Sequence, residues 1–235
     1  MASRMNPSLV QTRPGFSGIS LPLILNKENK FLIGFIWYVM ATSLYLIANR
    51  FHYFEPQMLP MSAIDTATPF WPQTVWVYTS EYIFFIFCYL SCKDVVNTNR
   101  YIYSFLFLQV VSVLIFTLWP TTFPRENFPL PENLDAATYY LFSSLRNTDT
   151  PANCCPSLHV SSVFLSSFLF LNEQRKKFPI FFIWGLLIAA STLTTKQHYL
   201  IDVVTGFLMS VLVYWIFYRV VSYYPLGQKP AGANR

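Results

Sequence analysis

Residues 198–220 read HYLIDVVTGFLMSVLVYWIFYRV, and this stretch decides the fold of the chain. No charged residue occurs between Asp202 and Arg219, and about 20 mostly apolar residues are enough for a helix to cross a bilayer. The stretch therefore predicts a membrane-spanning helix. His198 and Asp202, four residues apart at its start, would lie on one face of that helix.

The composition of the whole chain agrees with a membrane protein. Of its 235 residues, 54% are hydrophobic and 11% are charged, whereas roughly a quarter of the residues in an ordinary soluble domain are charged. The net charge of +5 would suit nucleic acid, but the basic residues lie in short connections between apolar stretches, where they orient helices in a membrane. We therefore expect one membrane domain and no nucleic-acid partner.

Six apolar stretches predict an all-α bundle of six transmembrane helices. They cover residues 31–49, 71–92, 101–120, 157–172, 178–195 and 200–222. We expect a cytoplasmic N-terminal segment 1–30, a membrane catalytic domain 31–222 and a cytoplasmic C-terminal tail 223–235. The connection between the third and fourth helices contains Pro124, Pro129, Pro131 and Pro151. Because proline interrupts helices, this connection is predicted to be a bent, Pro-rich extracytoplasmic loop.

Lysine and arginine predict the orientation, because they are enriched in cytoplasmic loops. With both termini in the cytoplasm, twelve of the 16 cations lie on the inside. The four outer cations are Arg50, Arg125, Arg146 and Lys196. This orientation puts His198 and Asp202 at the periplasmic face, and the short loops suggest a bacterial inner membrane.

Two histidines are candidates for chemistry. Asp202 could accept the proton on one ring nitrogen of His198, which leaves the other nitrogen free to attack an electrophile. His159 begins another apolar stretch shortly after Pro156. Asn153 or Ser157 could cap that helix. Its N-terminus would suit a phosphate, and His159 could protonate a leaving oxygen. The alternatives are a His–Asp hydrogen bond without a chemical role and a core histidine behind a helix cap.

Together, the two segments resemble the type 2 phosphatidic acid phosphatase superfamily, which also contains sphingolipid headgroup transferases. Its Pro-Ser-Gly-His motif is matched by Pro156, Ser157 and His159, with Leu158 in place of the glycine. Its motif of Ser-Arg, five residues, His, three residues and Asp is matched in register by Ser191, His198 and Asp202.

The resemblance implies a six-helix bundle and a mechanism through phosphohistidine. In that mechanism His198 is the nucleophile, Asp202 is its partner and His159 is the acid. Ser157 and Ser191 would contact the phosphate. No cofactor is implied.

The chain departs from the family pattern at its cations. Thr192 stands where the family has arginine, and Lys196 is the candidate replacement. The family's first motif, a lysine followed by Arg-Pro, is absent in literal form, and Arg125 or Arg146 could take its place. At least two cations are expected, because a phosphoryl transition state carries spread negative charge. The alternative for both arginines is a solvated loop charge.

These observations predict a membrane enzyme that cleaves a phosphate ester of a membrane lipid. The variant motifs around His159 and His198 resemble most closely the inositol phosphorylceramide synthase branch, which transfers a headgroup to a lipid alcohol. Hydrolysis and transfer to such an acceptor therefore stay open. So does a catalytically inactive protein that binds lipid phosphate.

Two further readings are less favoured. A transporter would need ionisable groups near the middle of the membrane, and Glu81 is the clear candidate, although we expect it at the interface or paired with Ser80 or Thr79. We expect no metal, although His159, His198 and Asp202 could pose as a two-His, one-carboxylate set.

Overall fold

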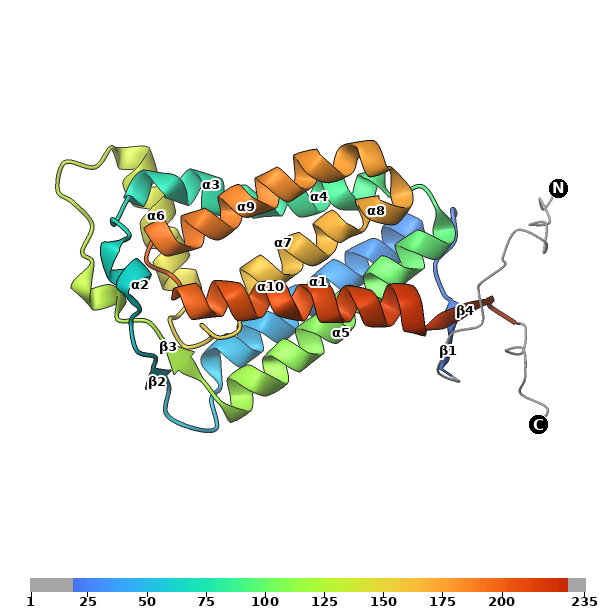
Figure 1. Ribbon diagram of the computed structural model, residues 1–235, viewed down its shortest axis with the longest axis horizontal. Coiled ribbons are helices and arrows are strands. Elements are labelled where there is room, and N and C mark those ends of the chain that lie inside the picture. The colour runs from blue at the N-terminus through green and yellow to red at the C-terminus, as the bar shows by residue number, and fades with distance from the viewer. Residues whose placement is uncertain (1–18, 228–235) are drawn as a thin grey trace.

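A computed structural model describes residues 19–227 of the chain (Figure 1). The protein is mostly helical, and its long helices run side by side between two ends. One end, here called the terminal end, carries β1 (Ser20–Leu23) and β4 (Ser222–Pro225). The other, the loop end, carries β2 (Gln57–Met58), α2 (Ala63–Ala67) and β3 (Thr121–Thr122).

The bundle is built from helices of very different lengths. Its α-helices are α1 (Lys30–Arg50), α3 (Val75–Thr79), α4 (Glu81–Ser91), α5 (Val95–Leu118), α7 (Leu158–Phe168), α8 (Phe170–Glu173), α9 (Phe178–Thr194) and α10 (Leu200–Trp215). Shorter turns are the 3-10 helices η2 (Pro72–Thr74), η3 (Arg125–Asn127) and η4 (Arg175–Lys177), and the π-helix η5 (Ile216–Val220), which continues α10.

The expectation of a mostly helical membrane protein is confirmed, but the number of spanning helices is not. Within residues 19–227, four helices are long and apolar enough to cross a membrane: Lys30–Arg50, Val95–Leu118, Arg175–Thr194 and Leu200–Val220. The other two predicted stretches, 71–92 and 157–172, are each divided into shorter helices, α3 with α4 and α7 with α8. Each pair nevertheless carries the chain from the loop end toward the terminal end (Figure 1).

Helix α7 is the centre of the bundle. All its residues except His159 are buried, and it packs against α10, α9, α4 and α5. The side-chain oxygen of Ser157 accepts a hydrogen bond from the backbone of Val160 and so caps the helix at the loop end. His159, in the first turn, is thereby held at a fixed position beside the neighbouring helices.

A glycine allows α10 to approach the start of α7. A Cβ atom at Gly206 would lie 2.5 Å from the carbonyl oxygen of Ser157, which is closer than real Cβ contacts. The backbone N–H of Ser157 also donates to the carbonyl of Asp202, at 3.0 Å. The segments that carry the two histidine motifs are therefore joined through their backbones.

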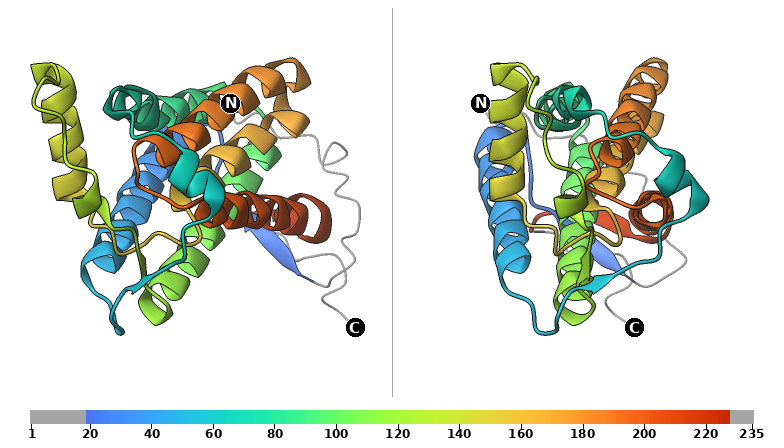
Figure 2. Two further views of the ribbon diagram at one scale, coloured as in Figure 1. Left: turned by 60° about the vertical axis from the view of Figure 1, so that its left-hand side comes forward. Right: turned by 90° about the vertical axis from the view of Figure 1, so that its left-hand side faces the viewer.

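The two connections at the loop end pack together. Strand β2, from the first, pairs in parallel with β3, from the second. The predicted Pro-rich loop is not irregular throughout, because it contains the 13-residue helix α6 (Ala136–Thr148), capped by the Asp135 side chain. Viewed onto the loop end, α2 lies against the start of α10 (Figure 2, right), where Asp65 accepts a hydrogen bond from the backbone of Leu200.

At the terminal end, β1 and β4 pair in parallel, with Ser20 opposite Ser222. Most of the predicted N-terminal segment 1–30 and part of the tail 223–235 lie outside the described residues. The assignment of both to the cytoplasm stays a prediction.

Candidate active site

His198 lies in the turn between α9 and α10, and one edge of its ring is fixed. Its Nδ1 is 3.0 Å from the carbonyl oxygen of Cys154 and 3.3 Å from Oδ2 of Asp202. Two acceptors on this side require the proton to be on Nδ1 when the ring is neutral. No described residue forms a hydrogen bond to Nε2, so that nitrogen keeps its lone pair available.

Asp202 has a structural task besides its contact with His198. Its Oδ2 accepts a hydrogen bond from the backbone N–H of Tyr199, at 2.8 Å, and so caps the start of α10. The carboxylate is completely buried, and its Oδ1 has no hydrogen-bond partner in the described part of the chain. The same carboxylate that caps the helix therefore also places negative charge next to the imidazole of His198.

His159 meets two residues that the sequence did not assign to it. Its Nδ1 lies 2.7 Å from Oε1 of Glu81, and its Nε2 lies 2.5 Å from the hydroxyl of Tyr78. The expectation that Glu81 pairs with Ser80 or Thr79 is therefore wrong, because its carboxylate turns inward to the histidine. The ring centroids of His159 and His198 are 5.7 Å apart, so one phosphate-sized group could contact both.

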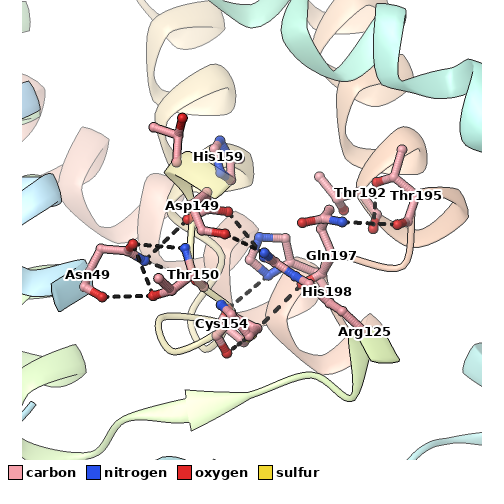
Figure 3. A network of polar contacts seen from close by, with 12 residues as sticks. Asn49, Arg125, Asp149, Thr150, Cys154, His159, Thr192, Thr195, Gln197 and His198 are labelled. Atoms are coloured by element: carbon pink, nitrogen blue, oxygen red, sulfur yellow. Dashed lines mark hydrogen bonds and ion pairs between the residues drawn. The ribbon is translucent and has the colours of Figure 1, made fainter. Parts of the chain in front are cut away.

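Arg125 forms a buried ion pair with Asp149. Its NH2 lies 3.1 Å from Oδ2 of Asp149, and its NH1 donates to the backbone carbonyl of the same residue. Tyr45 and Asn49, both from α1, donate to the other carboxylate oxygen of Asp149. In Figure 3, Arg125 and Asp149 point toward each other beside His198, with His159 next to Asp149. Burial alone would lower the pKa of Arg125, but the charge of Asp149 raises it, so the guanidinium stays charged.

The other predicted cations are used elsewhere. Lys196 has a positive φ of 55°, and its ammonium donates to the carbonyls of Asp65 and Thr68 at the end of α2. Arg146 donates to the carbonyl of Phe128 and stacks over Phe142, and burial lowers its pKa to about 10. Neither residue forms a hydrogen bond with a histidine or with Asp149.

The hydroxyl groups of Ser157, Ser191 and Thr192 also form hydrogen bonds within their own segments of the chain. The hydroxyl of Ser191 donates to the carbonyl of Ile188, and that of Thr192 to the carbonyl of Ala189, one turn back on α9. Ser157 caps α7. Thr192 still acts on the site through its backbone, since its carbonyl accepts the N–H of His198, at 3.3 Å.

A cavity of about 440 Å³ adjoins the His159 side of the site. Glu81, His159 and Asp149 line it at the polar end, and apolar residues of α1, α4 and α5 such as Trp37, Phe85 and Phe105 line the rest. His198 does not line this cavity. A volume of this size, mostly apolar with a few converging polar groups, is typical of a small-molecule site.

One group of metal-ligating side chains is close enough to share an ion, among the described residues. The ligand atoms of Cys154, His198 and Asp202 lie within 4.8 Å of one another. Burial and the charge of Asp202 raise the pKa of the Cys154 thiol well above its usual value, so this ligand would have to lose a firmly held proton. The absence of a metal stays a prediction.

A match to a known family model identifies the superfamily of the chain. Residues 57–216 match the family described as the PAP2 superfamily, the type 2 phosphatidic acid phosphatases. The chain belongs to the PAP2 superfamily. Membership implies the activity of a phosphoric ester hydrolase or phosphotransferase. No curated protein matches the chain.

The PAP2 match covers both histidines, Asp202 and Arg125, but it begins after α1 ends at Arg50. Tyr45 and Asn49, which bind Asp149, and Trp37, which lines the cavity, therefore lie outside the matched range. In this PAP2 protein a helix beyond the family match completes the candidate site.

Proposed function

We propose that this protein is an integral-membrane lipid phosphatase or phosphotransferase that works through a phosphohistidine on His198. The observation that carries the proposal is the free Nε2 of His198, on a ring whose other nitrogen is held by Cys154 and Asp202, with His159 5.7 Å away between ring centroids. This is the arrangement of an oriented nucleophile beside a general acid.

The first half of the reaction forms a bond between phosphorus and Nε2 of His198 and breaks the ester P–O bond. His159 supplies the proton to the departing oxygen. The carboxylate of Glu81 accepts a hydrogen bond from Nδ1–H of His159 and balances the charge of the ring. The hydroxyl of Tyr78 lies beside Nε2 of His159. The leaving oxygen therefore either displaces this hydroxyl from Nε2 or receives the proton of His159 through the hydroxyl.

Arg125 and the N-terminus of α7 are the proposed sources of positive charge for the phosphoryl group. The guanidinium is already held by Asp149 at the edge of the site. The helix adds the positive end of its dipole. In the second half, water or a lipid alcohol gives its proton to His159 and attacks phosphorus, and the bond to His198 breaks.

The proposal includes six membrane crossings, with α3–α4 and α7–α8 as the two divided ones. Both termini would be cytoplasmic, and the site would face the periplasm of a bacterial cell. The distribution of lysine and arginine supports this orientation. The substrate would enter with its phosphate at the loop end and its chains along the apolar wall of the cavity.

Headgroup transfer, as in the inositol phosphorylceramide synthase branch, is the second candidate function. It is favoured by the cavity, since an acceptor with apolar chains could occupy it after the first product leaves. An inactive phosphate-binding protein is the third, and the altered cation positions favour it.

A product analysis separates these functions. Purified protein would be incubated with labelled phosphatidic acid, a prenyl diphosphate or phosphatidylinositol, with and without ceramide or diacylglycerol. Free phosphate without an acceptor would support hydrolysis, and a new phospholipid formed only with the acceptor would support transfer. Lipid binding without any product would contradict the catalytic proposal.

Replacing Glu81 with glutamine tests its role behind the general acid. Glutamine can keep a hydrogen bond to Nδ1 of His159 but cannot balance its charge. We expect cleavage of a lipid phosphate to slow by about 10- to 100-fold, less than loss of the whole acid would cost, since general acid catalysis supplies about 10²- to 10⁴-fold. The first release of p-nitrophenolate from p-nitrophenyl phosphate, measured as a burst, should change little, because this leaving group needs no proton.

His159→Gln is the matched comparison and should show the same selectivity with a larger loss. A Glu81→Gln variant that loses both activities equally would indicate a purely structural contact.

A further inference from the structure

A second cleft lies at the terminal end, away from the histidines. It has a volume of about 350 Å³ and is formed by η4 with the adjoining residues of α8 and α9 on one side, and by α10 with η5 on the other. Its lining residues are Leu171, Asn172, Arg175, Phe178, Tyr214 and Arg219. Two guanidinium groups therefore share one cleft, and no acidic side chain lines it.

Three side chains of this cleft, those of Arg175, Arg219 and Tyr214, have hydrogen-bond donors without an acceptor among the described residues. The Nε of Arg175 donates to the carbonyl of Leu171, and no residue between 19 and 227 forms a hydrogen bond with its two terminal nitrogens. The side chain of Arg219 has no hydrogen-bond or ion-pair partner among the described residues. The amide of Asn172 donates to the hydroxyl oxygen of Tyr214, at 2.8 Å, so the hydroxyl proton of Tyr214 remains available for an acceptor.

No nearby acid neutralises the two arginines. The closest carboxylate along the chain, Glu173, instead accepts bonds from the backbones of Lys93 and Asp94 and from the side chain of Asn97. The undescribed segments 1–18 and 228–235 contain no aspartate or glutamate. Within the described part of the chain, the cleft is thus a concave group of donors without a counter-charge.

The backbone on the α10 side is unusual as well. Arg219 belongs to a π-helix that continues a regular α-helix, and such π turns are rare and occur often at functional sites. Phe178 and Tyr214 give the cleft apolar walls, and the ring of Phe168 contacts both, stacked on Phe178 and tilted against Tyr214. An occupant with a negative headgroup and an apolar body would match both parts.

We propose that this cleft binds the phosphate of an anionic phospholipid in the leaflet opposite the candidate active site. Arg175 and Arg219 would bind the phosphate oxygens, the Tyr214 hydroxyl would donate to one of them, and the acyl chains would follow the aromatic wall into the bilayer. Basic pockets between membrane helices bind such headgroups through the same combination of charge and apolar surface. The site does not depend on the proposed reaction.

The test measures lipid retention by the full-length protein. Wild-type protein in detergent would be titrated with phosphatidylglycerol or phosphatidylcholine and examined by native mass spectrometry. The variant Arg175→Ala/Arg219→Ala should bind phosphatidylglycerol about 10- to 30-fold more weakly, because each basic residue near a membrane surface contributes several-fold. Phosphatidylcholine binding should not change.

The matched control is Lys176→Ala/Lys177→Ala, which removes the same number of positive charges, both from η4, without changing a residue that lines the cleft. It should retain wild-type affinity, and an equal loss would mean that only surface charge matters. Tyr214→Phe, which removes one hydroxyl, should show a smaller loss, and provides a test if the double arginine variant fails to fold. Displacement of the lipid by an equal concentration of inorganic phosphate would also overturn the proposal.

Discussion

Replacing His198 with alanine should reduce turnover by at least about 10⁴-fold, because the reaction loses its covalent route. The measurement is the formation of an acid-labile, alkali-stable phosphoprotein from substrate labelled in its phosphate. Wild-type protein should become labelled transiently, and His198→Ala should not be labelled at all. The hydrogen bond from the ring to Cys154 goes to the backbone carbonyl, so the substitution leaves the bond from the Cys154 N–H to the carbonyl of Thr121 in place.

The His159→Gln variant is the comparison for this experiment. If it loses activity but still accumulates label with a good leaving group, the nucleophile and the acid are separated. Labelling of His198→Ala at the wild-type level would place the nucleophile elsewhere. Thermal unfolding of each purified variant shows whether a loss of activity reflects a loss of fold.

Replacing Arg125 with alanine should have two separable effects. Asp149 would be left as a buried charge without its ion-pair partner, and this costs about 3–5 kcal/mol of folding free energy. The phosphoryl group would also lose its nearest proposed cation, which we expect to reduce kcat/KM by about 10³-fold, the lower part of the range for a cation that acts on a transferring phosphoryl group. Unfolding and kinetics would be measured on the same preparation.

The double variant Arg125→Ala/Asp149→Asn separates the two effects. Asparagine removes the unpaired charge but can still accept from Tyr45 and Asn49, so stability should recover by most of the loss. Activity should not recover if Arg125 binds the phosphate. Recovery of both would show that Arg125 serves only to neutralise Asp149.

The sequence predicted contacts within one element better than contacts between elements. The spacing of His198 and Asp202 predicts their proximity, and the two side chains do meet at the start of α10. The expected shared helix face is nevertheless wrong, because His198 lies in the turn before α10, which begins at Leu200. The Asp202 carboxylate reaches His198 from the first turn of α10, where it also accepts the backbone N–H of Tyr199. The start of α7 at Ser157 follows from the same kind of local signal, a capping side chain.

The hydrogen-bond partners of His159 could not be predicted from local sequence spacing. Tyr78 and Glu81 are about 80 residues away along the chain, and only packing of α3 and α4 against α7 brings them to the ring. One sign was available, since a glutamate within an apolar stretch needs a partner. Sequence alone did not identify which residue that partner would be.

Lys196 shows that a residue close to His198 in sequence need not direct its side chain toward His198. It is two residues from His198, yet its left-handed backbone conformation directs the ammonium to α2. Helix α6 was missed for a related reason. The prolines around it indicated an interrupted loop, although they flank the helix and none lies within Ala136–Thr148.

The pairing of β1 with β4 has a consequence for topology. Ser20 and Ser222 are 202 positions apart in sequence, and their hydroxyls are 2.7 Å apart. A chain that leaves one face of a bilayer and returns to it has crossed an even number of times, so four or six crossings satisfy the pairing and five do not. Reporters fused ahead of β1 and behind β4 would consequently emerge in the same compartment, within reach of each other.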